Sequence, residues 1–138
     1  MKHAFKVLAL TALLSACATQ PVDSSQARAV PPSNMLSAQQ LSPGPGTGKL
    51  IVTRDSGLMG AACSTRIYVD GEPIIDLDTS EKFEFYLPVG DHVLGARPNG
   101  ICGGGSSGVE VTIAENRTKI YRVSSGQSGD IIIQPSAF

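Results

Sequence analysis

The chain has 138 residues, with 11 Lys and Arg against 12 Asp and Glu, so its formal net charge is −1. It has no basic patch, few aromatic residues and no tryptophan, which excludes the usual patterns of nucleic-acid binding, and we expect no nucleic-acid partner. The length suits one small domain with a modest core.

Residues 1–16 have the layout of a secretory signal peptide. Lys2 and Lys6 precede a short apolar run over residues 7–14, and two small residues then lead to Cys17. The apolar run is far shorter than the roughly 20 residues that a membrane-spanning helix needs. We therefore expect residues 1–16 to be removed and the mature chain to be exported.

Leu14-Ser15-Ala16-Cys17 resembles the lipobox of bacterial lipoproteins. In that family the cysteine thiol carries a diacylglycerol, and the amino group freed by cleavage receives a further acyl chain such as palmitate. The resemblance implies a lipid anchor at Cys17 that holds the protein on a membrane without spanning it, because several acyl chains anchor stably. Ala18 in place of Asp implies the outer membrane. The alternative is a soluble exported protein whose cleavage site adjoins a cysteine.

Residues 17–46 follow as a segment typical of a flexible linker. Between Ala18 and Gly46 stand five of the nine prolines, two charged residues and no sustained apolar period. Low hydrophobicity with abundant Pro, Ser and Gln cannot bury enough surface to offset the entropy of ordering. We therefore predict a disordered tether, about 30 Å from end to end as a random coil, that lifts a folded domain off the lipid surface.

Residues 47–138 are predicted to form one all-β domain, because apolar and polar residues alternate with period two in nearly every segment. The clearest alternating segments are 50–52, 67–69, 83–87, 109–113 and 131–133. Turn residues separate them at short intervals, and Asp70-Gly71 is the strongest hairpin signal. The pattern predicts a single small antiparallel β-sandwich of seven or eight strands.

The stretch from Ile67 to Arg97 resembles PEGA-type surface-layer modules and related exported β-sandwich lipoproteins. It contains "IYVDGEPI" and then "FYLPVGDHVLGAR", which match the Val-Asp-Gly turn and the Leu-Pro-x-Gly-x-His turn of those modules. The resemblance implies a structural or protein-interacting module, not an enzyme. The chain departs from the pattern in the cysteine-bearing, glycine-rich loop that follows Arg97.

With Cys17 assigned to the lipid, Cys63 and Cys102 remain as an even pair in an exported protein, where disulfides persist. A bridge would close a loop of about 40 residues, for which chain entropy gives about 4 kcal/mol of stabilisation. Unpaired buried thiols and a thiolate metal site are the alternatives. Because the chain lacks the dense ligand spacing of zinc sites, we predict a disulfide and no metal.

The predicted disulfide joins the two least regular segments, "DSGLMGAAC" at 55–63 and "CGGGSSG" at 102–108. The second satisfies Gly-x-Gly-x-x-Gly, but a strand follows where a phosphate needs a helix, so we expect no nucleotide and no cofactor. Loops on a rigid scaffold often carry binding residues. The candidate interaction residues are Leu58, Met59, Ile101, Gly103, Gly104 and Gly105. Alternatively, the apolar ones pack over the open end of the sandwich.

No catalytic constellation stands out elsewhere in the sequence. Asp76, Asp78 and Glu81 form an acidic cluster without the spacing of an EF-hand loop. His92 is the single histidine after the signal peptide, and no Gly-x-Ser-x-Gly elbow accompanies it. We therefore predict a protein that is not an enzyme and has no catalytic residues.

Two hypotheses from different classes remain. The first is a lipid-anchored adaptor of the cell envelope, which binds an envelope protein through an edge strand or through the joined loops. The second is a ligand-binding or hydrolase-inhibiting module, since known inhibitors of envelope hydrolases are also small, disulfide-bonded, lipid-anchored β proteins.

Overall fold

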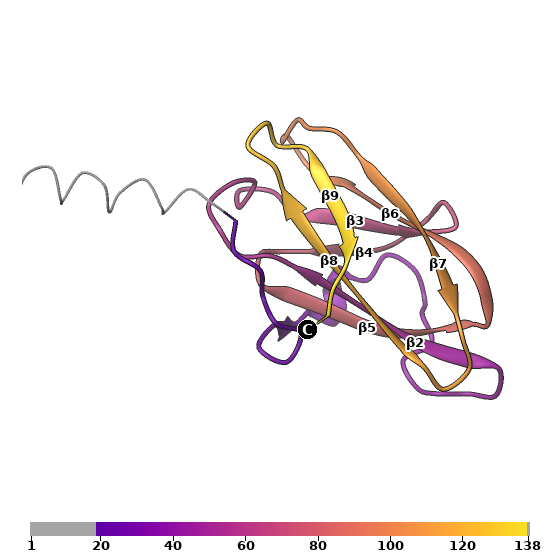
Figure 1. Ribbon diagram of the computed structural model, residues 1–138. Helices are drawn as coiled ribbons and strands as arrows, with labels where there is room; N and C mark the ends of the chain where they lie inside the picture. The colour runs from indigo at the N-terminus through magenta and orange to yellow at the C-terminus, as the bar shows by residue number, and fades with distance from the viewer. Residues whose placement is uncertain (1–18, 138) are drawn as a thin grey trace, which may run out of the picture.

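The computed structural model describes residues 19–137, which form an all-β sandwich of two sheets (Figure 1). The strands are β1 (Arg28–Ala29), β2 (Thr47–Arg54), β3 (Thr65–Val69), β4 (Glu72–Leu77), β5 (Glu81–Pro88), β6 (Gly90–Pro98), β7 (Ser107–Ile113), β8 (Thr118–Ser125) and β9 (Ile131–Pro135). One short 3-10 helix, η2, covers Pro32–Asn34. The predicted fold class is confirmed, because eight described strands have five or more residues and only β1 is shorter.

The five-stranded sheet has the order β1-β5-β2-β8-β9, and the four-stranded sheet has the order β4-β3-β6-β7. Most neighbours are antiparallel, as predicted, but β2 pairs with β8 in parallel and β1 pairs with β5 in parallel. A parallel pair needs a long connection, and between β2 and β8 the chain forms all four strands of the four-stranded sheet and also β5, which pairs with the other edge of β2.

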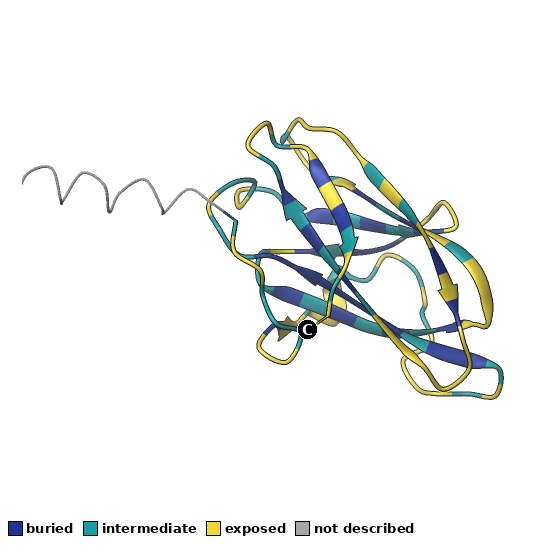
Figure 2. Cartoon of the chain, in the orientation of Figure 1, coloured by how far each residue is buried: buried dark blue, intermediate teal, exposed yellow. Residues whose placement is uncertain are grey.

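The core lies between the sheets and is built from the residues that the period-two pattern places on one face. Leu50 and Val52 of β2, Phe85 of β5 and Ile67 of β3 are fully buried. Buried and less buried positions alternate along β3 and β5, as the pleat requires, whereas the central strand β2 is buried along almost its whole length (Figure 2). Phe83 stacks on Phe85 with ring centres 4.9 Å apart, so the aromatic content of the core is concentrated on β5.

Residues 19–46 lie against the sandwich, so the predicted flexible linker is wrong for this part of the chain. β1 extends the edge of β5, where Arg28 pairs with Glu81. Further on, the Leu36 amide donates to the Ile74 carbonyl of β4 at 3.0 Å. Residues 28–40, which we call the edge strap, therefore pass from the edge of β5 to the edge of β4 and return to β5, where the Gln40 carbonyl accepts from the Tyr86 amide at 2.8 Å.

Two apolar side chains explain why the edge strap is ordered despite its composition. Val30 and Met35 are partly buried and pack against the core where it opens between β5 and β4. The backbone hydrogen bonds of the strap also cover these two strand edges, which would otherwise present unpaired donors and acceptors. A composition rich in Pro and Ser does not reveal that the segment is ordered. An extended backbone is enough to pair with a strand edge, and only two apolar side chains are needed to pack against the core.

The predicted signal peptide, residues 1–16, and the predicted lipidation site Cys17 lie outside the described residues. Within residues 19–137, no helix has the length and apolar character to cross a membrane.

Candidate functional site

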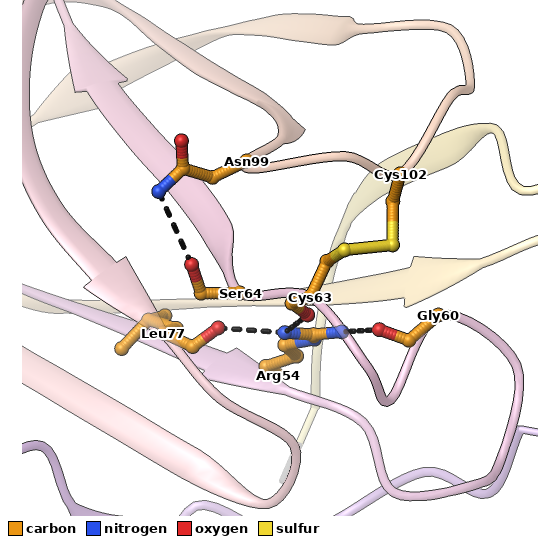
Figure 3. The surroundings of a disulfide bond; sticks show 7 residues. All are labelled: Arg54, Gly60, Cys63, Ser64, Leu77, Asn99 and Cys102. Carbon is orange, nitrogen blue, oxygen red and sulfur yellow. Dashed lines mark hydrogen bonds between the residues drawn. A yellow bond between two sulfur atoms is a disulfide. The ribbon is translucent and has the colours of Figure 1, made fainter.

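The predicted disulfide is present and joins two loops at one end of the sandwich. Cys63 lies near the end of the β2–β3 loop, and Cys102 lies in the β6–β7 loop, with their Cα atoms 6.1 Å apart. Beside the bridge, the Asn99 side chain lies 3.3 Å from the Ser64 hydroxyl (Figure 3). The loops at 55–64 and 99–106, named here the joined loops, are thus held at their bases by a covalent bond and a hydrogen bond.

Arg54, which the sequence analysis did not single out, organises the first of these loops. Its side chain is buried between the sheets, with 3% of the residue exposed. The guanidinium donates to the carbonyl oxygens of Gly60 at 2.7 Å, Cys63 at 2.8 Å and Leu77 at 2.7 Å (Figure 3). Because Leu77 belongs to β4 in the opposite sheet, Arg54 ties the loop and both sheets together.

The electrostatic setting of Arg54 is unusual for a buried cation. Burial lowers the pKa of Arg54, and the negative charges of Asp78 and Glu81 act in the opposite direction. Within residues 19–137 the guanidinium forms no ion pair, and its contacts are carbonyl dipoles. Arginine stays protonated under ordinary conditions, so these carbonyls are the groups that compensate its lost hydration.

The second loop is fastened to the β8–β9 loop as well as to the disulfide. Asp130 accepts a hydrogen bond from the Gly105 amide at 2.6 Å, and the Ile131 amide donates to the Gly105 carbonyl at 3.0 Å. Hydrogen bonds from Ser128 and from the Gly105 amide lower the pKa of Asp130, so it remains ionised. Gly104 has a φ of 136°, and a Cβ there would collide with the Gly129 backbone, which explains the glycine.

The structure places the apolar candidates on the outside of the joined loops. Leu58 is 71% exposed and Ile101 is 100% exposed, whereas Met59 is partly buried. The alternative that these residues cover the open end of the sandwich is therefore wrong for Leu58 and Ile101. Arg54 occupies that position instead. The remaining candidates, Gly103, Gly104 and Gly105, are all exposed.

A small cavity lies behind the disulfide. It measures about 30 Å³ and is lined by residues that include Arg54, Cys63, Cys102 and Ser125. This volume admits one or two water molecules but no organic ligand. Any binding at the joined loops therefore takes place on their surface.

A second candidate surface lies on the outer face of the four-stranded sheet. Tyr68 stands opposite Gly95, and Gly95 stands opposite Gly108, so two neighbouring strands lack side chains beside the tyrosine. The guanidinium carbon of Arg97 lies 5.0 Å from the centre of the Tyr68 ring, and Val93 is half exposed. We call these five residues the glycine shelf. Sequence reasoning missed it, because only the strand register brings the two glycines together.

The predicted acidic cluster is engaged in structural contacts. Arg66 donates to both carboxylate oxygens of Asp76 at 2.8 Å, and Asn99 donates to one of them at 2.9 Å. The Glu81 carboxylate accepts from the Asp78 amide at 2.9 Å. Among residues 19–137, no three or more His, Cys, Asp or Glu side chains are grouped so that they could hold a metal ion.

His92 joins two turns at the end of the sandwich opposite the disulfide. Its Nδ1 lies 2.7 Å from a carboxylate oxygen of Asp70, and its Nε2 lies 2.9 Å from the Pro88 carbonyl oxygen. Asp70 also accepts from the Val93 amide at 2.8 Å. Both ring nitrogens face acceptors, so only the imidazolium satisfies both contacts. The ring therefore has no free nitrogen for general-base catalysis in this arrangement.

The His92 contacts predict a pH-dependent stability. Burial acts to lower the pKa of His92, but the hydrogen bonds to Asp70 and Pro88 and the charges of Asp70 and Asp91 outweigh it and raise the pKa above 6.5. The His92 contribution is thus complete below about pH 6.5 and is lost as the pH rises through the folded-state pKa.

The measurement is thermal unfolding of the wild type and of His92→Gln at several pH values from about 6 to 9. Because the pair is partly exposed, we expect the wild type to be more stable by at most about 1 kcal/mol at pH 6, with the difference shrinking toward pH 9. Hydrogen bonds from His92 and from the Val93 amide lower the pKa of Asp70, so the same advantage also falls in strong acid. A difference that grows with rising pH contradicts the assignment.

No protein-family model matches the chain, and neither a curated protein nor a solved structure matches it. The lipobox and the PEGA-like segment therefore stay resemblances, and the function is argued from the residues themselves.

Proposed function

We propose that the chain is a lipid-anchored protein of the bacterial cell envelope, attached to the outer membrane through Cys17, and that it acts as a non-catalytic structural or protein-interaction adaptor. The Leu14-Ser15-Ala16-Cys17 sequence supports the anchor. The glycine shelf is the observation that carries the interaction role. A flat strip beside an aromatic ring and an arginine suits a protein surface, since Tyr and Arg are enriched at the centres of interfaces.

The rest of the described chain supports a scaffold. Its buried carboxylates are bound: Asp55 pairs with Arg122, and Glu81 accepts the Asp78 amide. Both ring nitrogens of His92 are engaged, one with Asp70 and the other with the Pro88 carbonyl. The edges of β4 and β5 are covered by the edge strap, which directs a partner to the sheet face.

The anchor is tested by metabolic labelling with a palmitate analogue in a bacterial host. We expect the wild-type protein to incorporate the label and to sediment with membranes. Cys17→Ala should do neither. The matched control is the double variant Cys63→Ala/Cys102→Ala, which should be labelled as the wild type is. Wild-type protein that is cut at residue 17 but carries no acyl mass would exclude the anchor.

The adaptor role is tested by photo-crosslinking in cells. A photoreactive phenylalanine analogue replaces Val93 on the glycine shelf or, as a control, exposed Thr118 on β8 of the opposite sheet. We expect one dominant envelope protein to be captured from position 93 and not from position 118. Equal capture from both positions, or capture of wall glycan alone, contradicts the adaptor role.

A second candidate function, ligand binding, is favoured by a hollow under the edge strap. It measures about 240 Å³, and its lining, mostly apolar, includes Val30, Met35, Leu41 and Phe83. This is slightly below the usual range of about 300–1,000 Å³ for small-molecule sites, so a short acyl or aromatic group is the fitting class. Binding of such a group should raise the unfolding temperature of the wild type but not of Met35→Trp, which fills the hollow.

A further inference from the structure

We propose that the joined loops rest in the surface of the lipid bilayer, with Leu58 and Ile101 inserted at the level of the head groups. This inference rests on the proposed lipid anchor at Cys17 and adds a second, non-covalent membrane contact to it. It also replaces the predicted long tether with a domain held directly against the membrane.

The described N-terminus lies beside the β2–β3 loop, which is one of the joined loops. Gln20 and Ser56 exchange backbone hydrogen bonds, from the Gln20 amide at 2.9 Å and from the Ser56 amide at 3.0 Å. Ser56 lies in the β2–β3 loop, so the described part of the chain begins beside this loop (Figure 1), which also contains Leu58. Cys17 stands three residues before Gln20 in the sequence. Three residues span at most about 10 Å, so an anchor at Cys17 keeps this end of the domain at the membrane.

The chemistry of the joined loops carries the second step. The sequence contains no Asp, Glu, Lys or Arg from 56 to 64 or from 99 to 108. Leu58 and Ile101 project from this uncharged surface, and the small residues Ala61 and Ala62 are exposed between them in the sequence. Single exposed apolar side chains are common, but these two lie on loops that a disulfide joins. An uncharged apolar loop also avoids the cost of placing ions in the head-group region. The neighbouring Asp130 of the β8–β9 loop is exposed, and its carboxylate accepts hydrogen bonds from the Ser128 hydroxyl and the Gly105 amide.

The short reach selects lipid over a folded protein as the occupant. The three residues from Cys17 to Gln20 reach at most about 10 Å, so an anchored domain stays close to the membrane. A partner domain of 100 residues has a radius of gyration of about 13 Å, which is too large to lie between the membrane and this end of the sandwich. The rigidity of the loops fits the same conclusion. The disulfide and Arg54 hold the β2–β3 loop in one conformation, so inserting Leu58 and Ile101 costs little further ordering.

The test uses the absence of tryptophan from the chain. The full-length, lipidated protein is reconstituted in vesicles of phosphatidylethanolamine and phosphatidylglycerol, with Leu58→Trp, Ile101→Trp or Val93→Trp as the single probe. Brominated lipids then report contact with acyl chains. All three positions are at least half exposed, so each variant should fold, which circular dichroism and intact disulfide mass confirm.

We expect blue-shifted emission and strong quenching in Leu58→Trp and Ile101→Trp, from a depth of about 5–10 Å, and neither effect in Val93→Trp. Equal quenching in all three variants, or none at positions 58 and 101, overturns the proposal. So does a photo-crosslink from position 58 to a protein instead of to lipid. Flotation separates the two proposals. Protein that lacks acyl mass and does not float with vesicles contradicts the lipid anchor. Protein that floats but whose tryptophans at positions 58 and 101 are not quenched contradicts only the insertion of the loops.

Discussion

Replacing Arg54 with methionine is expected to lower the free energy of unfolding by about 3–5 kcal/mol, because three carbonyl groups lose the guanidinium as a donor. These belong to Gly60, Cys63 and Leu77, and the last lies in the opposite sheet. The Gly60 carbonyl keeps the Cys63 amide as a donor at 3.2 Å. Methionine fills much of the same volume, so the loss reports the missing donors more than a cavity. Small domains have about 5–15 kcal/mol of stability in total, so this variant should be marginal.

The measurement is urea unfolding followed by far-ultraviolet circular dichroism, with Arg97→Met as the matched control. Arg97 is exposed and its guanidinium is stacked on Tyr68, a contact worth about 0.5–1 kcal/mol. Arg54→Lys should fall between the two, because an ammonium group donates to carbonyls but lacks the planar fork that reaches three of them. If Arg54→Met unfolds at the same urea concentration as Arg97→Met, the guanidinium does not organise the loop.

Arg54 also shows where sequence reasoning about the site stops. In the sequence it is the charged last residue of an alternating segment, "KLIVTR", and such a residue is normally solvated. Alternation does place it on the same face as Leu50 and Val52, and this signal was present. The three carbonyl partners come from a loop and from the other sheet, so their convergence depends on how the sandwich closes.

The fold itself was largely predictable, because period-two alternation and turn residues act locally. The Asp70-Gly71 turn is an example: its φ angles of 51° and 86° are those that an Asp-Gly hairpin demands. The cysteine pair was predictable from parity and export alone. The parallel pairing of β2 with β8 was not, because it joins segments far apart in the chain and alternation says nothing about strand order.

The prediction of a flexible linker over the edge strap was wrong for a different reason. Its Pro-rich and Ser-rich composition describes how the segment behaves in isolation, and by that measure it is disordered. Val30 and Met35 gain burial only because the sandwich leaves an opening between β5 and β4. Because residues from Gln20 onward are ordered against the sandwich, the proposed lipid anchor at Cys17 is close to the loop that holds Leu58. The wrong prediction of a long flexible tether and the proposed membrane contact thus have the same cause.

Removing the disulfide by Cys63→Ala/Cys102→Ala is expected to lower the free energy of unfolding by about 4 kcal/mol, because the bridge closes a loop of about 40 residues in the unfolded chain. The sequence separation of the two cysteines is 39. Reduction of the wild type with dithiothreitol should give the same loss in urea unfolding, which controls for the packing of the alanines. A loss below about 1 kcal/mol would show that the contacts of Arg54 and Asp130 hold the loops without the bridge.

The two largest effects act on the same β2–β3 loop, so they should not add. Arg54 holds this loop at Gly60 and Cys63, and the disulfide holds it at Cys63. Without the bridge the loop can open locally, and its carbonyls then reach water, so the later loss of Arg54 costs less. We expect the triple variant Arg54→Met/Cys63→Ala/Cys102→Ala to fall short of the sum of the separate losses by about 1–2 kcal/mol. Strict additivity would mean that Arg54 stabilises the fold chiefly through Leu77, across the two sheets, and that the loop conformation depends on the disulfide alone.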